Sequence, residues 1–134
     1  MMRAAKKAAK KINKKIKVLG VTILTSFSNK SLRKTGHTKS IKKIVELQAK
    51  LIRSAGLDGV ICSGHEAKII KKIYRNFEII TPGIRFGGDK KQDQKRIMTP
   101  NQAFKNGATA IVIGRSITKG NIKNNLQKLI KLLN

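Results

Sequence analysis

The sequence predicts an α/β protein in which helices cover a parallel sheet. Short apolar runs rich in β-branched residues alternate with longer amphipathic stretches along the chain. Four of these runs are apolar throughout, as is typical of strands in a parallel sheet. At 134 residues the chain is expected to form one domain, with a leading helix followed by four strand–helix units.

Residues 1–16 are predicted to form a basic amphipathic helix. Its apolar residues step by three or four positions: Met2, Ala5, Ala9, Ile12 and Ile16. We favour a surface helix whose apolar stripe packs on the sheet. A basic membrane-surface helix or a targeting segment is the alternative, although the segment is rich in Lys and lacks Ser.

The first two strand–helix units follow this helix. A buried strand is predicted over 17–24, then a short helix over 28–34 and a long helix over 40–55. Gly56 stands where a left-handed helix C-cap is expected. A second strand is predicted over 58–62 and the helix of this unit over 65–74.

The second half of the chain repeats the alternation twice. A third strand is predicted over 77–80, and a long polar loop over 81–98. The next helix has clear start signals, because Thr99 can cap it, Pro100 suits the first helical position and Gln102 can complete a capping box. The helix is expected to close at Asn106-Gly107. The final elements are a strand over 108–113 and a helix over 121–133.

Periodicity alone fits both a doubly wound sheet and a (β/α) barrel. A complete eight-unit barrel needs about 250 residues, so this chain has room for half of one. The sequence shows no internal repeat and no Gly-rich nucleotide loop of the usual spacing.

Composition excludes several classes of protein. No stretch approaches the ~18 uncharged apolar residues of a transmembrane helix, and Cys62, the single cysteine, cannot form a disulfide framework. We therefore expect a cytoplasmic protein without a membrane role. The 31 Lys and Arg against 6 Asp and Glu give a formal net charge of +25. Because 24 of these cations are Lys and they spread along the whole chain, we favour solvated helix faces and keep a polyanion-binding surface, nucleic acid included, as the less favoured alternative.

The carboxyl ends of the predicted strands carry the candidate binding residues, since ligands of parallel α/β folds gather there. Arg85 and Arg115 follow the third and fourth strands, and an Arg side chain offers a planar fork of donors that suits phosphate. Gly114 lets the backbone approach an oxygen closely, and Gln94 can donate from the long loop. The sequence therefore predicts an anion site at this edge.

Other interpretations of the same residues stay open. The two arginines could instead pair with Asp89 or Asp93, or lie in solvent. Cys62 is expected to be a small buried apolar residue rather than a nucleophile, and His65 a surface or capping residue. With two histidines, one cysteine and no ligand spacing, no metal site is predicted.

The strand-end strings resemble those of the orotidine 5′-phosphate decarboxylase family, in order and over nearly the whole chain. The matching strings share their place at strand ends: VTILTS at 21–26, GLDGVICS at 56–63, TPGIR at 81–85, DQKRIMTP at 93–100 and GRSIT at 114–118. The MMRAA start at 1–5 is similar to the start of the family's middle helix. Ser116 departs from the family pattern, which usually has Pro there.

This resemblance implies the C-terminal half of a (β/α)₈ TIM barrel, from a homodimeric and cofactor-free enzyme. The family converts orotidine 5′-monophosphate to uridine 5′-monophosphate in pyrimidine synthesis. By the family pattern, Arg85, Gln94, Gly114 and Arg115 hold the substrate phosphate, and Thr25 contacts the pyrimidine ring. The anion site derived from the residues and the family's phosphate site therefore coincide.

The resemblance covers only the second half of the family. Its alternating Asp-Lys-Asp-Asp catalytic network comes from the first three barrel strands, and no D-x-K-x-x-D string occurs in these 134 residues. We therefore expect no catalytic residue in this chain and no activity of the chain alone. A split enzyme with an N-terminal half-barrel chain and a degraded remnant are both consistent with the sequence, as is a non-catalytic phosphate-binding half-barrel.

Overall fold

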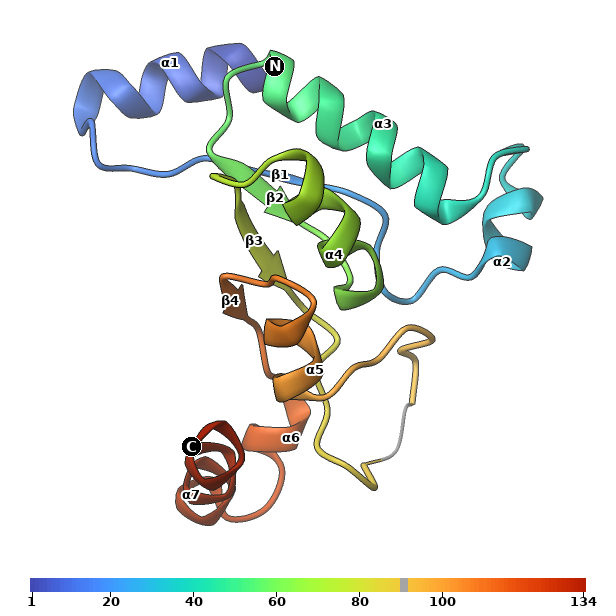
Figure 1. Ribbon diagram of the computed structural model, residues 1–134, viewed down its shortest axis with the longest axis vertical. Coiled ribbons are helices and arrows are strands. Elements are labelled where there is room, and N and C mark those ends of the chain that lie inside the picture. The colour runs from blue at the N-terminus through green and yellow to red at the C-terminus, as the bar shows by residue number, and fades with distance from the viewer. Residues whose placement is uncertain (90–91) are drawn as a thin grey trace.

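A computed structural model describes residues 1–89 and 92–134 of the chain (Figure 1). These residues form one four-stranded sheet in the order β1-β2-β3-β4, with every pairing parallel. The strands are β1 (Leu19–Val21), β2 (Gly59–Ile61), β3 (Glu78–Thr81) and β4 (Ala110–Ile111). The helices are α1 (Met2–Ile12), α2 (Asn29–Lys34), α3 (Ile41–Ser54), α4 (Gly64–Ile73), α5 (Pro100–Lys105), α6 (Arg115–Thr118) and α7 (Ile122–Leu133).

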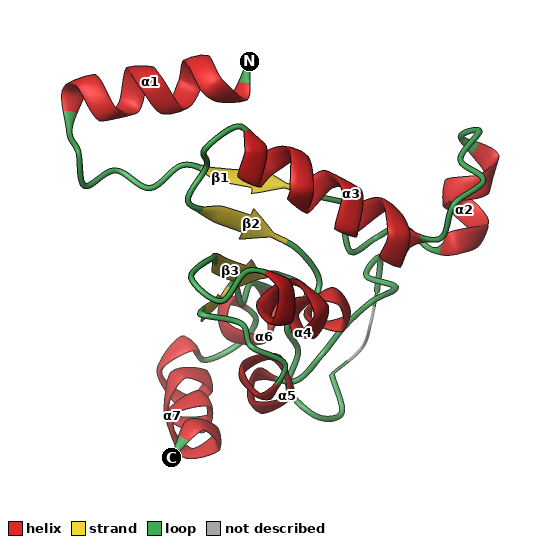
Figure 2. Ribbon diagram, turned by 45° about the horizontal axis from the view of Figure 1, so that its top comes forward, coloured by secondary structure: helices red, strands yellow, loops and turns green. Residues whose placement is uncertain are grey.

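The predicted fold class is confirmed: a leading helix precedes four parallel strands that follow one another in chain order. Figures 1 and 2 show α3 and α4 on one side of the sheet, with α1 and α7 at opposite ends of the molecule. Sequential order with a helix after each strand is the arrangement of a barrel wall. The alternative of a doubly wound sheet, in which strand order reverses at a switch point, is therefore excluded.

The outer face of the sheet, meaning the face toward α3 and α4, is closely packed. The strand register aligns Gly20, Val60 and Ile79 in one row on this face, and both Val60 and Ile79 are fully buried. A Cβ on Gly20 would lie 2.4 Å from Ile52 Cδ1, so only glycine allows α3 to approach β1 this closely. The main core therefore lies between the sheet and these two helices.

The inner face of the sheet is apolar but open. Side chains alternate along a strand, and the register brings Val21, Ile61, Ile80 and Ala110 into one row on the opposite side. Val112 follows on the same side of the chain. Val21 remains 58% exposed and Val112 51% exposed. The expectation of strands covered throughout is thus met on one face only, because the described residues provide nothing to pack against the other.

The N-terminal helix α1 contributes little to the core. The apolar stripe of α1 has no buried residue, and Ile12 is 86% exposed. Most of this stripe therefore does not pack on the sheet as predicted, although Met2 contacts the core. The helix is instead fastened by an ion pair between Lys6 and Asp58 and by Met2, which packs against the core.

Several predicted boundaries also change. The first helix ends at Ile12 rather than residue 16, because Asn13 turns extended and its Oδ1 accepts the Lys15 N–H. The strands over 17–24 and 108–113 are shorter than predicted, since parallel pairing holds only at their centres. The short helix α6 was not predicted. Within the described ranges, no helix combines the length and apolarity needed to cross a bilayer.

Candidate functional site

All five residues proposed from the sequence lie together in one hollow at the carboxyl edge of the sheet. This hollow, which we call the arginine pocket, has a volume of about 210 Å³. Its lining is Thr25, Pro82, Gly83, Arg85, Gln94, Val112, Gly114 and Arg115. The exits of β1, β3 and β4 supply these residues, so the parallel sheet brings together side chains up to ninety positions apart in the sequence.

Arg85 is a buried cation at the base of the arginine pocket. The residue is only 6% exposed, and its Nη1 donates to the carbonyl oxygen of Ile84 at 2.8 Å. A parallel bridge between Ile84 and Met98 fixes the backbone on either side. Among the described residues Arg85 forms no ion pair. A buried guanidinium without a carboxylate favours an external anion, because burying an unpaired charge is costly.

Arg115 is the more exposed cation, and an internal carboxylate meets it. Its Nη2 pairs with Asp93 Oδ1, and its Nη1 donates to Gln92 Oε1. The sequence left two alternatives to an anion site: the arginines pair with an aspartate, or they lie in solvent. Arg115 pairs with an aspartate. Arg85 is buried and pairs with none among the described residues. The hydrogen bond from Arg115, followed by one from Gln94, lowers the pKa of Asp93 below its ordinary value.

Gln94 and Thr25 form the opposite wall of the arginine pocket. Thr25 Oγ1 donates to Gln94 Oε1, and Gln94 Nε2 donates to Asp93 Oδ2 at 3.0 Å. Asp93 thus accepts hydrogen bonds from both Gln94 and Arg115, two of the residues that the sequence predicts to bind the substrate phosphate. Sequence reasoning left the Arg115–Asp93 pair open as an alternative and missed only the contact between Gln94 and Asp93. The adjacency of Asp93 and Gln94 was its only signal.

Glycines keep the arginine pocket open. A Cβ at Gly114 would meet nothing within 4 Å, so this position faces open space beside the two arginines. Gly83 has φ +77, and a Cβ there would lie 3.1 Å from the Arg96 carbonyl oxygen and 3.2 Å from Thr25 Cγ2. The loop after β3 can therefore approach Thr25 only with glycine at this position.

A second hollow adjoins the arginine pocket and differs from it in chemistry. This apolar pocket has a volume of about 210 Å³ and shares Thr25, Pro82 and Gln94 with the arginine pocket. Its other lining residues are Val21, Ile23, Leu24, Ser26, Ile61 and Cys62. Together the two pockets form a site with a cationic end and an apolar end, which suits a ligand with an anionic group joined to a less polar part.

A third hollow lies on the other side of the two arginines. It has a volume of about 300 Å³ and is lined by Arg85 and Arg115 together with Lys119 and Lys128 of the C-terminal region. Lys128 Nζ also lies 5.0 Å from the centroid of the Phe86 ring. Lys119 and Lys128 add positive charge near Arg85 and Arg115, partly offset by the carboxylate of Asp89, which also lines this hollow.

Neither Cys62 nor a metal cluster adds chemistry to the site. Cys62 is 1% exposed, and burial, followed by the nearby Glu66 carboxylate, raises the pKa of its thiol to about 12. The thiol therefore stays protonated and acts as the small buried residue that the sequence suggested. Over residues 1–89 and 92–134, no group of three or more His, Cys, Asp or Glu side chains is placed to hold a metal ion.

The fold and the site together define half of a barrel wall with two arginines in loops at the carboxyl ends of its strands. Comparison with known proteins makes this class specific. The sequence model of the "Orotidine 5'-phosphate decarboxylase / HUMPS family" matches residues 1–128, and the chain belongs to this family. The family resemblance inferred from the strand-end strings is confirmed.

Individual relatives support the assignment over part of their length. The chain is 54% identical over 104 residues to an orotidine 5′-phosphate decarboxylase of Prochlorococcus marinus, covering 76% of this chain and 43% of that protein. It is 48% identical over 103 residues to a Coxiella burnetii protein of the same name, covering 76% and 44%. The crystal structure of the Lactobacillus acidophilus enzyme matches with a TM-score of 0.69 and 36% identity, covering 88% of this chain and 49% of that one. The chain thus spans less than half the length of these relatives.

Proposed function

We propose that this chain is the substrate-phosphate-binding half of an orotidine 5′-phosphate decarboxylase, which releases CO₂ from orotidine 5′-monophosphate to give uridine 5′-monophosphate. The observation that carries the proposal is the arginine pocket, where Arg85, Arg115, Gln94, Gly114 and Thr25 line a single hollow. The named relatives are decarboxylases of this substrate.

The two pockets support a nucleotide as the ligand. Arg85 and Arg115 can each offer charge-assisted hydrogen bonds to phosphate oxygens at the cationic end. The adjoining apolar pocket, beginning at Thr25, has room for part of the sugar and the pyrimidine ring. Binding requires Asp93 to release Arg115 and Gln94, so the phosphate replaces an internal carboxylate.

We infer that the chain alone does not catalyse the reaction. Decarboxylation requires a cation placed where it stabilises the developing carbanion. Residues that bind the phosphate hold the substrate but place no cation at the reacting carbon. We propose that a second half-barrel chain brings the Asp-Lys-Asp-Asp network and covers the inner face of the sheet. A cytoplasmic setting and the family's dimeric state belong to the same proposal.

Turnover measurements test the need for a second half. The purified chain, incubated with orotidine 5′-monophosphate, should give no uridine 5′-monophosphate above background. Addition of the N-terminal half of the Prochlorococcus marinus relative should restore measurable turnover. Product formed by the chain alone would contradict the proposal.

Binding measurements test the arginine pocket without any turnover. The chain should bind uridine 5′-monophosphate with millimolar affinity, about 4 kcal/mol, because the other half of the contacts is missing. Arg115→Ala should remove about 1.5–3 kcal/mol of this binding, whereas Lys14→Ala on the exposed N-terminal segment should leave it almost unchanged. Equal losses in an NMR titration would mean diffuse electrostatic attraction.

A polyanion-binding half-barrel is the second candidate function, favoured by the net charge of +25. Such binding would be sequence-independent and would fall steeply with salt. Duplex DNA titrations at two salt concentrations distinguish the two functions, since nucleotide binding in the arginine pocket depends on Arg115 and duplex binding on the total charge.

A further inference from the structure

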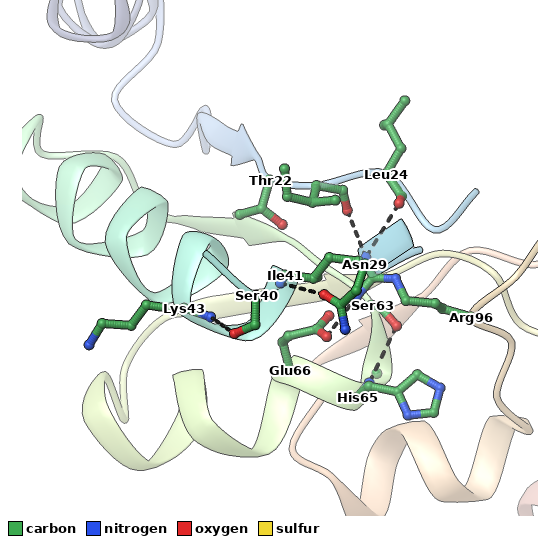
Figure 3. Close-up of polar contacts among 12 residues, drawn as sticks. Thr22, Leu24, Asn29, Ser40, Ile41, Lys43, Ser63, His65, Glu66 and Arg96 are labelled. Atoms are coloured by element: carbon green, nitrogen blue, oxygen red, sulfur yellow. Dashed lines mark hydrogen bonds and ion pairs between the residues drawn. The ribbon is translucent and has the colours of Figure 1, made fainter. Parts of the chain in front are cut away.

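A buried ion pair lies beside the arginine pocket without lining it. Arg96 Nη1 contacts Glu66 Oε1 at 2.6 Å, and the two side chains are only 12% and 8% exposed. Arg96 comes from the long loop after β3, whereas Glu66 belongs to the first turn of α4. Figure 3 shows the two side chains facing each other, with Leu24 of the β1 exit on the far side of Arg96.

Arg96 also binds the backbone at the exit of β1. Its Nη2 donates to the carbonyl oxygens of Ile23 at 3.1 Å and of Leu24 at 3.3 Å. The backbone N–H groups of Lys95 and Arg96 donate to the Thr25 carbonyl oxygen at 3.2 and 3.1 Å. Four hydrogen bonds therefore fasten loop residues 95–96 to residues 23–25.

These contacts determine where one wall of the arginine pocket lies. Gln94 immediately precedes the fastened segment, and its side chain accepts a hydrogen bond from Thr25 Oγ1. Both residues belong to the proposed ligand-binding set, and they come from distant parts of the chain. Their relative position depends on Arg96, which Glu66 holds in place.

The ion pair is poorly suited to a purely stabilising role. Glu66 Oε2 and Arg96 Nε are buried and have no hydrogen-bond partner among the described residues. Removing two charges from water costs about as much as their attraction returns, so a buried pair adds little net stability. The defined geometry of the pair is what an apolar replacement would lose.

We propose that Glu66 and Arg96 are positioning residues, which hold Gln94 and Thr25 in the geometry that receives the anionic group of the ligand. This inference rests on the proposed function of the arginine pocket. It assigns the role to an ion pair that does not itself touch the ligand. A loss of the pair should therefore affect anion affinity separately from stability.

The test compares three variants of the full chain with inorganic phosphate as the probe. Glu66→Gln leaves Arg96 buried without its carboxylate and should lower both stability and phosphate affinity, the latter about fivefold. Arg96→Lys keeps the charge but lacks the second nitrogen that reaches the carbonyls of Ile23 and Leu24. This variant should stay folded and also bind phosphate several-fold more weakly.

The double variant Glu66→Gln/Arg96→Met separates positioning from stability. Both buried charges are gone, so urea unfolding should show stability regained relative to Glu66→Gln, while phosphate affinity stays about fivefold reduced. Amide hydrogen exchange at Lys95 and residue 96 should be faster than in the wild type in all three variants. Glu46→Gln is the matched control, because it removes a carboxylate paired with Lys43 on α3 and should change neither readout.

The outcomes distinguish a failure of the positioning role from a failure of the proposed phosphate-binding function. Recovery of wild-type phosphate affinity in the double variant, together with its stability, would overturn the positioning role and leave a structural ion pair. Unchanged affinity in Arg96→Lys would overturn it as well. A wild-type chain that binds no phosphate would overturn the proposed function and the positioning role together.

Discussion

The outer and inner faces of the sheet are both apolar, yet only the outer face is packed. Val60, on the outer face, is fully buried, whereas Val21, on the neighbouring strand and the inner face, is 58% exposed. Apolar sequence therefore predicts that a strand is buried in the complete protein, but it does not say which part of the protein covers it. Under the proposed function, the inner face is the side that the second half-barrel would cover.

A matched pair of valines gives the largest expected difference between the two faces. Val60→Ala should lower the free energy of unfolding by about 2 kcal/mol, from lost burial and the cavity left behind. Val21→Ala should change it by less than about 0.5 kcal/mol, because that side chain is already in water. Urea unfolding followed by circular dichroism measures both. Equal losses would show that the inner face is covered in the isolated chain.

Self-association is the second expected consequence of the open face. The edges of β1 and β4 have no partner strand among the described residues, and such edges favour association. The chain should elute with a concentration-dependent size, more so at higher salt, which screens the repulsion between chains of +25. Val112→Lys should weaken association about tenfold, or ~1.4 kcal/mol. A monodisperse monomer at every concentration would contradict the exposed-edge interpretation.

The contact that attaches α1 to the amino ends of the strands, between Lys6 and Asp58, should have a smaller effect on stability. Burial alone would raise the pKa of Asp58, but hydrogen bonds from Lys6 and from the Val18 N–H (2.6 Å) outweigh it and lower that pKa. A lowered folded-state pKa contributes stability that is present at neutral pH and lost as the pH falls through that pKa. Asp58→Asn should cost about 1 kcal/mol at pH 7 and flatten the acid side of the stability profile. An unchanged acid profile would mean that Asp58 is equally ionised in the unfolded chain.

Asp93 gives the smallest effect, at the carboxyl ends of the strands. Its carboxylate competes with an incoming anion for Arg115 and Gln94, and its lowered pKa keeps it charged at neutral pH. Asp93→Asn should therefore raise phosphate affinity about two- to threefold in an NMR titration at pH 7. A weaker affinity would mean that the carboxylate orients Arg115 instead of competing for it.

Sequence reasoning located the site because strand ends can be recognised locally. Apolar runs that end before Thr25, Arg85 and Arg115 identify one edge of a parallel sheet, and the structure brings the three residues together at that edge. The order of the strands followed from the alternation with helices. These features depend on short stretches of chain, which a sequence displays directly.

Contacts between distant residues escaped the same reasoning. Glu66 and Arg96 are thirty positions apart, and neither stands at a position where a strand ends. The pairing of Asp93 with Arg115 was one open alternative, and the sequence could not select it because it depends on how a loop folds back. The unburied stripe of α1 escaped as well, because an amphipathic pattern identifies the apolar face without identifying what covers it.

The parallel direction of β1 and β4, whose outer edges have no partner strand among the described residues, has a consequence for how the proposed second half-barrel would join. If a second half-barrel closes the sheet as proposed, it must pair one strand with β4 and another with β1, both running the same way as the strands here. Once the first seam has formed, the second closes within one complex, at an effective concentration far above that of free chains in solution. Closure of the barrel should therefore be cooperative, and assemblies with only one of the two strand pairings should be scarce. A substitution that weakens the pairing at either β1 or β4 should weaken the whole complex.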